Sequence, residues 1–314
     1  MRIVFLGTGE FAVPALRALV AAGHEVVRAI SQPDRPSGRG RTVKPSAVHA
    51  AATALGIPHV QAADVNALVA SEVAGAEIGV VAAFGQKLGP AVLAAYPRGC
   101  INIHGSLLPK YRGAAPYQWA IINGETQTGV TVFQIERRWD AGPIWGQREV
   151  VIGETETADE LHDRLAEVGA GLVVETLAAL ERGSVEARGQ DRALVTRAPK
   201  LSRADGVVDW AEPAERVARR INGLWSWPAA TCAFVSRTGR REQVQLARAR
   251  VAEAVDAGAA LPPGSFLADG TVRAGRGRVR LLEVKPAGGK LMSFEAFANG
   301  RQVAPLDRLL PPDS

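Results

Sequence analysis

Short apolar runs alternate with amphipathic stretches along the first half of the chain. The runs are rich in Val and Ile, and they lie at residues 2–7, 25–31, 77–84 and 99–106. Runs that are apolar on both faces are typical of parallel strands covered by helices, and the stretch from Phe11 to Ala22 has helical spacing. The pattern therefore predicts an α/β fold whose N-terminal domain contains a doubly wound, mostly parallel, Rossmann-like sheet.

Two later strands and a long helix extend this domain. Residues 128–135 and 144–152 have strand patterns, and helical spacing runs from about Ala158 to Leu180. Thr157 precedes Glu160 by three residues, which is the spacing of a capping box. We expect the helix to begin at this box.

The pattern changes after Gly183. The next stretch is polar, with Gly, Pro and scattered Arg, and is typical of a linker. A helix over about 213–222 and several short β-like segments between Gly and Pro turns follow, which predict a smaller OB-like β-barrel. We therefore expect an N-terminal domain over 1–189, a linker over 190–205 and a C-terminal barrel domain over 206–314.

The composition is that of an ordinary globular protein, with 47% apolar and 22% charged residues among 314. No apolar stretch is long enough to span a membrane, and the N-terminus has no secretion leader, so no membrane partner is expected. Cys100 and Cys232 do not make a disulfide framework and fit a reducing cytoplasm. We expect a cytoplasmic protein that acts as a monomer.

Positive charge gathers in the C-terminal third of the chain. Residues 206–314 carry 16 basic and 11 acidic side chains, net +5, whereas residues 1–189 carry 17 and 19, net −2. A basic appendage on a near-neutral body indicates a polyanionic partner. Charge alone leaves a second interpretation open, which is solubility in an Arg-rich sequence.

A glycine motif follows the first predicted strand. Gly7-x-Gly9-x-x-Ala12 opens a helix, which is the context of a dinucleotide fingerprint. The acidic residue that should close the second strand is displaced, because Asp34 lies in the following loop. The arginines beyond it would suit NADP. An NADP-dependent oxidoreductase therefore stays open beside a structural role, in which the glycines allow a tight turn.

Residues 32–46 form a basic segment, "QPDRPSGRGRTVKPS", with no acid after Asp34. Its Gly and Pro content predicts a mobile loop. Such a loop can hold a phosphate backbone through bidentate Arg contacts, or it can be a solvated loop with no partner. Its cations are Arg35, Arg39, Arg41 and Lys44.

The strongest chemical signal is the stretch "INIHGSLLPKYRGAAP" at 101–116. Side chains at i and i+2 of a strand share a face, so Asn102 and His104 lie together at its C-terminal end. An amide that donates to an oxyanion and an imidazole that carries protons suit attack on a carbonyl. The sequence offers no nucleophilic Ser or Cys nearby, which favours direct transfer to an amine. A hydrogen-bonded core His is the alternative.

A third polar group is needed beside the imidazole. Asp140, in "RRWDAGPIW", lies between two predicted strands, although an Asp before Gly is usually a turn former. The His and Cys residues have no metal-ligand spacing, so no metal is expected.

The stretch "NIHGSLLPKYRGAAPYQWAI", with "DAG" downstream, resembles the formyltransferase family that uses 10-formyltetrahydrofolate. Further segments that are similar to members acting on tRNA are "QPDRPSGRGRTVKPSAV", "INGLWSWPAA" and "LLEVKPAGGKLMSFEAFANG". The core motif also fits sugar-nucleotide formyltransferases. Typical members carry "GLDTG" around the Asp, where this chain continues with "AGPIWG".

The resemblance implies a function and a set of site residues. It implies transfer of a formyl group from 10-formyltetrahydrofolate to the α-amino group of initiator methionyl-tRNA. It implies that Asn102, His104 and Asp140 are catalytic, and that the loop cations at 35, 39, 41 and 44 contact the tRNA. The residues expected against the folate are Ser106, Leu107, Leu108 and Pro109.

Overall fold

The computed structural model describes residues 1–37, 42–68, 75–253 and 261–312. The chain forms two compact units, and each is built from three pieces of sequence. The first unit contains Met1–Pro116, Thr128–Val150 and His162–Ala198. The second contains Tyr117–Gln127, Val151–Leu161 and Pro199–Ser314. The predicted division at 189 and 206 stays a prediction.

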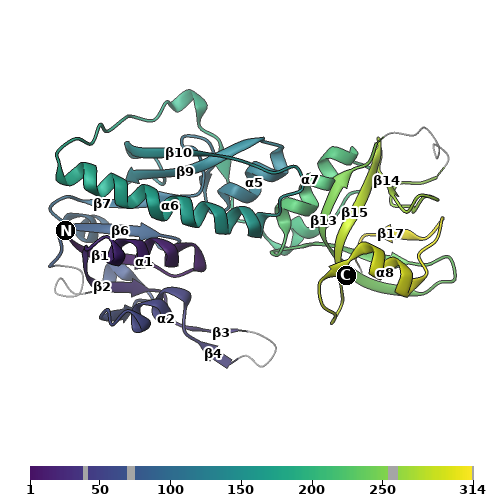
Figure 1. The fold of residues 1–314 in the computed structure, drawn as a ribbon, viewed down its shortest axis with the longest axis horizontal. Helices are drawn as coiled ribbons and strands as arrows, with labels where there is room; N and C mark the ends of the chain where they lie inside the picture. Colours follow the sequence, from purple (N-terminus) through teal and green to yellow (C-terminus); the bar gives the residue numbers. More distant parts are fainter. Residues whose placement is uncertain (38–41, 69–74, 254–260, 313–314) are drawn as a thin grey trace. The chain divides into compact units, whose positions relative to one another are not determined.

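A seven-stranded sheet is the centre of the first unit, with strand order β10-β9-β7-β6-β1-β2-β5 (Figure 1). Five neighbouring strands, from β7 to β5, are parallel, and β9 runs antiparallel to β7. The predicted doubly wound, mostly parallel sheet is confirmed. The strands are β1 (Arg2–Gly7), β2 (Glu25–Ser31), β5 (His59–Gln61), β6 (Ile78–Ala82), β7 (Cys100–His104), β9 (Gln127–Gln134) and β10 (Ile144–Val151).

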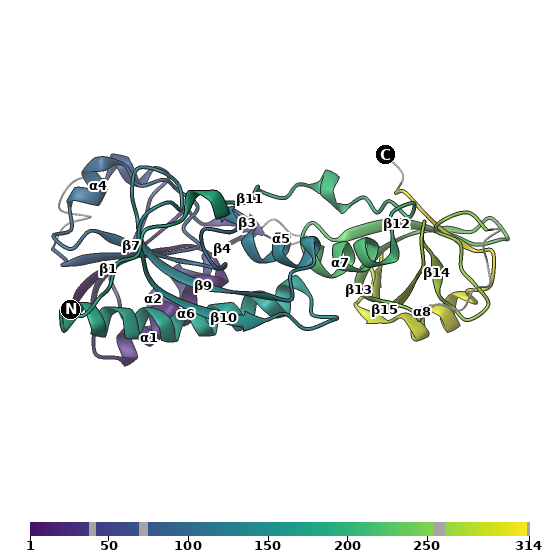
Figure 2. The same cartoon turned by 90° about the horizontal axis from the view of Figure 1, so that it is seen from above.

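Helices cover the two faces of this sheet, because its central strands are apolar on both sides. In Figure 2, α1 and α6 lie on one side of the sheet and α4 on the other. Thr157 and Glu160 exchange hydrogen bonds of 2.9 and 3.4 Å, so the predicted capping box at the start of α6 is confirmed. The helical segments are η1 (Glu10–Ala12), α1 (Val13–Ala21), α2 (Ala47–Ala54), η2 (Val65–Ala67), α4 (Pro90–Ala94) and α6 (Ala158–Glu181).

Two small strand pairs lie outside the main sheet. The segment expected to be a loop forms an antiparallel pair, β3 (Arg35–Ser37) with β4 (Thr42–Lys44). Residues 38–41, which join these strands, are outside the described residues. The second pair is parallel and joins β8 (Arg112–Gly113) to β11 (Arg197–Ala198). Residues from the predicted linker are thereby held on the first unit.

The second unit is built on an antiparallel sheet of order β14-β15-β13-β12-β17, with β16 paired to β15. Its apolar core includes Phe234, Phe266 and Phe297, and α7 belongs to the same core through Val217 and Ile221. The sheet agrees with the predicted C-terminal β domain, and its closure into an OB-like barrel stays a prediction. Its strands are β12 (Ala230–Val235), β13 (Arg241–Val251), β14 (Val272–Arg273), β15 (Arg278–Pro286), β16 (Met292–Ser293) and β17 (Arg308–Leu310).

The helical elements that remain are η3 (Arg192–Leu194) in the first unit, and η4 (Arg203–Gly206), α7 (Ala214–Leu224) and α8 (Phe294–Arg301) in the second. Helix α5 (Pro116–Asn123) belongs, apart from its first residue, to the second unit. No helix in the described part of the chain is long and apolar enough to cross a membrane.

Candidate active site

Asn102 and His104 lie at the carboxyl end of β7, as alternation along the strand predicts. β7 is the last parallel strand of the sheet, with β6 on one side and antiparallel β9 on the other. The His104 side chain is buried, whereas Asn102 is half-buried. No hydrogen-bond partner for the Asn102 carboxamide is found among the described residues, so its donors are available to a ligand.

The His104 ring is oriented by the backbone of the loop after β7. Its Nε2 lies 2.9 Å from the carbonyl oxygen of Tyr111. A carbonyl can only accept, so Nε2 carries a hydrogen and donates it. The other ring nitrogen, Nδ1, lies 4.0 Å from Oδ2 of Asp140. Proton chemistry at this imidazole is thereby assigned to Nδ1.

Asp140 is buried and held by two contacts from other segments. Its Oδ2 accepts a hydrogen bond of 2.8 Å from the Gly113 N–H, and its backbone carbonyl accepts one of 2.9 Å from Gln190 Nε2. Its φ is +48°, in the left-handed region that Asp and Asn tolerate better than most residues. This backbone turn brings the carboxylate to His104 from the loop between β9 and β10.

The arrangement joins an acid and an imidazole that are both nine-tenths or more buried, beside a free carboxamide. An oxyanion that forms here would meet donors, and a proton that leaves would meet a base. Family models match the chain on both sides of this site. One described as formyl transferase covers residues 1–177, and one described as formyl transferase, C-terminal domain, covers residues 200–302.

The chain belongs to the formyl transferase family. A methionyl-tRNA formyltransferase from Heliobacterium modesticaldum is 44% identical over 314 residues, covering 97% of this chain and 98% of that protein.

Solved structures of family relatives share the fold. An N-formyltransferase from Helicobacter canadensis, in complex with folinic acid and dTDP-3-aminofucose, gives a TM-score of 0.65 at 15% identity, covering 89% of this chain and 98% of that one. HypX from Aquifex aeolicus, in complex with tetrahydrofolic acid, gives 0.60 at 21% identity, covering 95% and 47%. At these identities the likeness concerns the fold alone.

The segment predicted to contact folate is mostly packed against the formyl transferase sheet. Ser106 is fully buried and donates a hydrogen bond of 2.7 Å to the Lys110 carbonyl, and Leu108 packs with Phe133 and Ile144. Leu107 and Pro109 are half-buried. Ligand contact by this segment would therefore fall to these two side chains.

Sequence reasoning missed the groups that brace the site. The Tyr111 carbonyl and the Gly113 N–H are backbone groups, which no side-chain pattern reveals. Gln190 lies at the start of the predicted linker and donates to the Asp140 carbonyl and, at 2.8 Å, to that of Gly142. Its only signal was a polar residue in a stretch read as a connection.

Of the four predicted tRNA-contacting cations, Arg35 and Lys44 are described, and they face each other as register partners at the base of the β3–β4 pair. Both are exposed, and Arg35 donates a hydrogen bond of 2.7 Å to Gln32. Arg39 and Arg41 lie outside the described residues.

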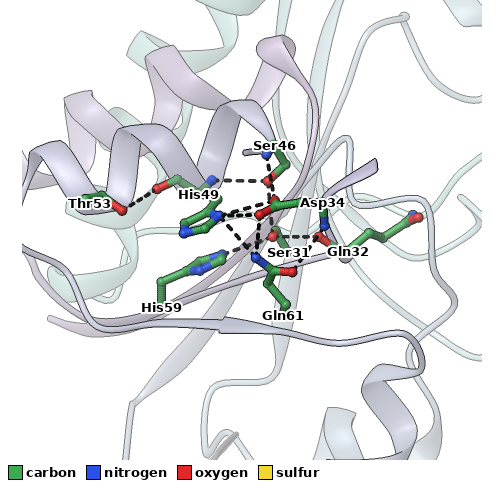
Figure 3. A network of polar contacts seen from close by, with 8 residues as sticks. All are labelled: Ser31, Gln32, Asp34, Ser46, His49, Thr53, His59 and Gln61. Atoms are coloured by element: carbon green, nitrogen blue, oxygen red, sulfur yellow. Dashed lines mark hydrogen bonds and ion pairs between the residues drawn. The ribbon is translucent and has the colours of Figure 1, made fainter. Parts of the chain in front are cut away.

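A polar network fastens the root of this hairpin, as Figure 3 shows. Asp34, which precedes β3, accepts hydrogen bonds from the Ser46 N–H at 2.9 Å and from Gln61 Nε2 at 2.8 Å. His49 Nδ1 lies 3.0 Å from the same carboxylate and its ring stacks on His59. Burial by itself raises the pKa of Asp34, but these hydrogen bonds outweigh it and the pKa is lowered. The Asp34 side chain thereby ties the two ends of the hairpin together.

These contacts also bear on the dinucleotide alternative. With its carboxylate engaged by Ser46, His49 and Gln61, Asp34 has little capacity left for a ribose hydroxyl. A side chain on Gly7 would meet Ala12 within 3 Å, so that glycine permits close packing of η1 on β1. The glycine motif is accounted for by the fold. No group of three or more His, Cys, Asp or Glu with metal-binding geometry is found within the described ranges.

Proposed function

We propose that this protein transfers the formyl group of 10-formyltetrahydrofolate to the α-amino group of methionyl initiator tRNA. The observation that carries the proposal is the buried His104–Asp140 pair, 4.0 Å apart, beside the free carboxamide of Asn102. The near-full-length match to a methionyl-tRNA formyltransferase supports the choice of acceptor. The folates bound by two relatives of the same fold support the choice of donor.

In the proposed reaction, the amine nitrogen bonds to the formyl carbon and the carbonyl electron pair moves onto oxygen. Asn102 and the protonated Nδ1 of His104 donate hydrogen bonds to this anion. The nitrogen then loses its proton, the bond from the formyl carbon to N10 of the folate breaks, and N10 takes a proton. No covalent enzyme intermediate is needed.

Asp140 supplies the negative charge in this scheme. Its carboxylate offsets the His104 imidazolium and receives the amine proton, directly or through water. The Gly113 N–H occupies one lone pair of Oδ2, which leaves Oδ1 as the acceptor that can take the proton.

The test is formyl transfer to methionyl-tRNA, with uncharged tRNA, free methionine and a nucleotide-linked amino sugar offered in parallel. We expect transfer to methionyl-tRNA alone. Asn102→Ala and His104→Ala should each slow the reaction by on the order of a hundredfold or more. Near-normal rates in both variants would defeat the residue assignment, and preference for the amino sugar would defeat the acceptor assignment.

Substrate contacts away from the chemistry are part of the same proposal. Arg35 and Lys44, with Arg39 and Arg41 between them, would approach the tRNA, and residues 106–109 would lie against the folate through Leu107 and Pro109.

We also propose that the protein acts in the cytoplasm, where initiator tRNA is charged, and as a monomer. Sedimentation at assay concentration tests the second point, since a mass of 33.1 kDa is expected.

A further inference from the structure

Arginines from three segments of the first unit gather around Asp140. Arg112 on β8 and Arg197 on β11 are register partners in a parallel pair. Arg192 lies in η3, two residues after Gln190, and Arg138 lies two residues before Asp140. These segments are not close in sequence, so the cluster exists only in the folded chain.

Hydrogen bonds fix these segments to one another. Gln190 Oε1 accepts from Arg112 at 2.6 and 3.0 Å, while its Nε2 donates to the carbonyls of Asp140 and Gly142. The Gly113 N–H reaches the Asp140 carboxylate at 2.8 Å. The positive charges are therefore held in place around the acid.

The cluster is electrostatically unfavourable without an anion. Burial lowers the pKa of Arg112, the nearby Asp140 opposes this, and the positive charges of Arg197, Arg138 and Arg192 lower it further. None of the four arginines forms an ion pair with a carboxylate in the described part of the chain. The nearby Asp191 is engaged in capping the Ala193 N–H at 2.9 Å. Gathered like charges without counter-ions indicate a surface that receives a polyanion.

An exposed aromatic ring belongs to the same surface. Trp139 is 58% exposed, although it lies between Arg138 and the buried Asp140. An exposed indole next to arginines is the usual platform on which an unpaired base stacks, because every base offers a π-face. Phosphate-binding cations beside a stacking ring favour single-stranded nucleic acid over a simple carboxylate ligand.

We propose that Arg138, Trp139, Arg192 and Arg197, called here the arginine rim, bind the unpaired 3′ end of the aminoacylated tRNA and position its amine beside His104 and Asp140. This inference rests on the proposed function and deepens it. The three arginines, which are exposed, hold phosphates, and Trp139 stacks on a base. Arg112 stays bound to Gln190 and orients the rim.

The test compares a rim variant with a matched control. The rim variant combines Arg138→Gln, Arg192→Gln and Arg197→Gln. The control makes the same change at three exposed arginines of the same unit, Arg2, Arg17 and Arg182, so the net charge of the two proteins is equal. Steady-state kinetics are measured with methionyl-tRNA and 10-formyltetrahydrofolate over a range of salt concentrations.

We expect the rim variant to raise the KM for methionyl-tRNA about tenfold or more, with kcat and the KM for folate within about twofold. Its dependence of log(kcat/KM) on log salt should be shallower by about 2, because each lost contact to a single strand removes about 0.7. Trp139→Ala should raise the same KM about fivefold or more without changing the salt slope.

The outcomes separate this inference from the proposed function. If the unaltered protein does not formylate methionyl-tRNA, the proposed function is wrong. If it does, but the rim variant matches the control in KM and slope, the rim inference is overturned. A raised KM for folate alone would also overturn it, since the arginines would then serve the carboxylates of the folate tail.

Discussion

At the residue scale, the site combines positions that the sequence reveals with positions that only the fold reveals. Asn102 and His104 were predictable because strand alternation places residues i and i+2 on one face. The position of Asp140 beside them was not predictable from spacing. It depends on a positive φ and on a hydrogen bond from the Gly113 N–H, a backbone group of a distant segment.

Asp140→Asn tests the charge of this residue without disturbing its backbone. Asn tolerates the left-handed region and keeps an oxygen for the Gly113 N–H, so we expect an unchanged melting temperature. Loss of the carboxylate should lower kcat by on the order of a hundredfold, with the KM for tRNA little changed. Thermal unfolding and single-turnover formylation measure the two effects. Full activity in this variant would remove Asp140 from the mechanism.

At the scale of elements, patterns with a strong period were read correctly and irregular segments were not. The α6 capping box and the Val-rich strands come from local sequence rules, and the structure contains them. The segment 35–44 was read as a loop because Gly and Pro dominate it. The Asp34 network at its root, drawn in Figure 3, supplies order that composition does not show.

Asp34→Ala tests whether this network positions the hairpin. The change removes the bond that joins residues 34 and 46, so the cations of the hairpin lose their fixed approach to the substrate. We expect the KM for methionyl-tRNA to rise on the order of tenfold, while kcat and the KM for folate stay near normal. Asp64→Ala, which removes a local cap on Asn66, is the control. Equal KM values in the two variants would show that the network does not act on the hairpin.

Glu160 gives the second unit a pH-dependent contribution to stability. Its hydrogen bond from Arg248, opposed in part by burial and aided by Thr157, lowers its pKa to about 2. A carboxyl whose folded pKa is lowered stabilises the fold above the unfolded value and loses that contribution as pH falls through the folded one. Its side chain is 47% exposed, so solvent screening keeps the effect small.

We therefore expect Glu160→Gln to lower the free energy of unfolding by about 1 kcal/mol at pH 7. The difference from the unaltered protein should shrink between pH 5 and pH about 2, the range over which the native carboxylate takes up its proton. Urea titrations at several pH values measure it. A difference that stays constant with pH would show that the effect is not electrostatic.

At the scale of the whole molecule, the two-part organisation was predicted as a single cut after the first domain, and the observed units are interleaved. Residues 117–127 and 151–161 come from the first half of the chain but belong to the second unit. Within that unit, Ile122 lies against Gly223, and Glu160 pairs with Arg248. Composition changes only at Gly183, so it could not reveal these pieces.

Each unit carries one cysteine, which allows its unfolding to be followed separately. Cys100 and Cys232 are buried, and burial raises the pKa of each thiol to about 12. We expect neither to react with a thiol reagent at pH 8 in the native state, because a thiolate is required. Cys232→Ala leaves a reporter for the first unit, and Cys100→Ala leaves one for the second. Rapid labelling of either in native protein would contradict the burial described here.

The interleaving of the second unit also constrains how such a protein can change over generations. A recombination event that replaced residues 199–314 with those of a distant cousin would import a β domain whose foreign surfaces must fit an inherited helix α5 and an inherited start of α6. Exchange of the tail as a cassette is thereby discouraged. Lineages should instead pass on the two halves together, with compensating changes at Ile122 and Gly223 arising in step.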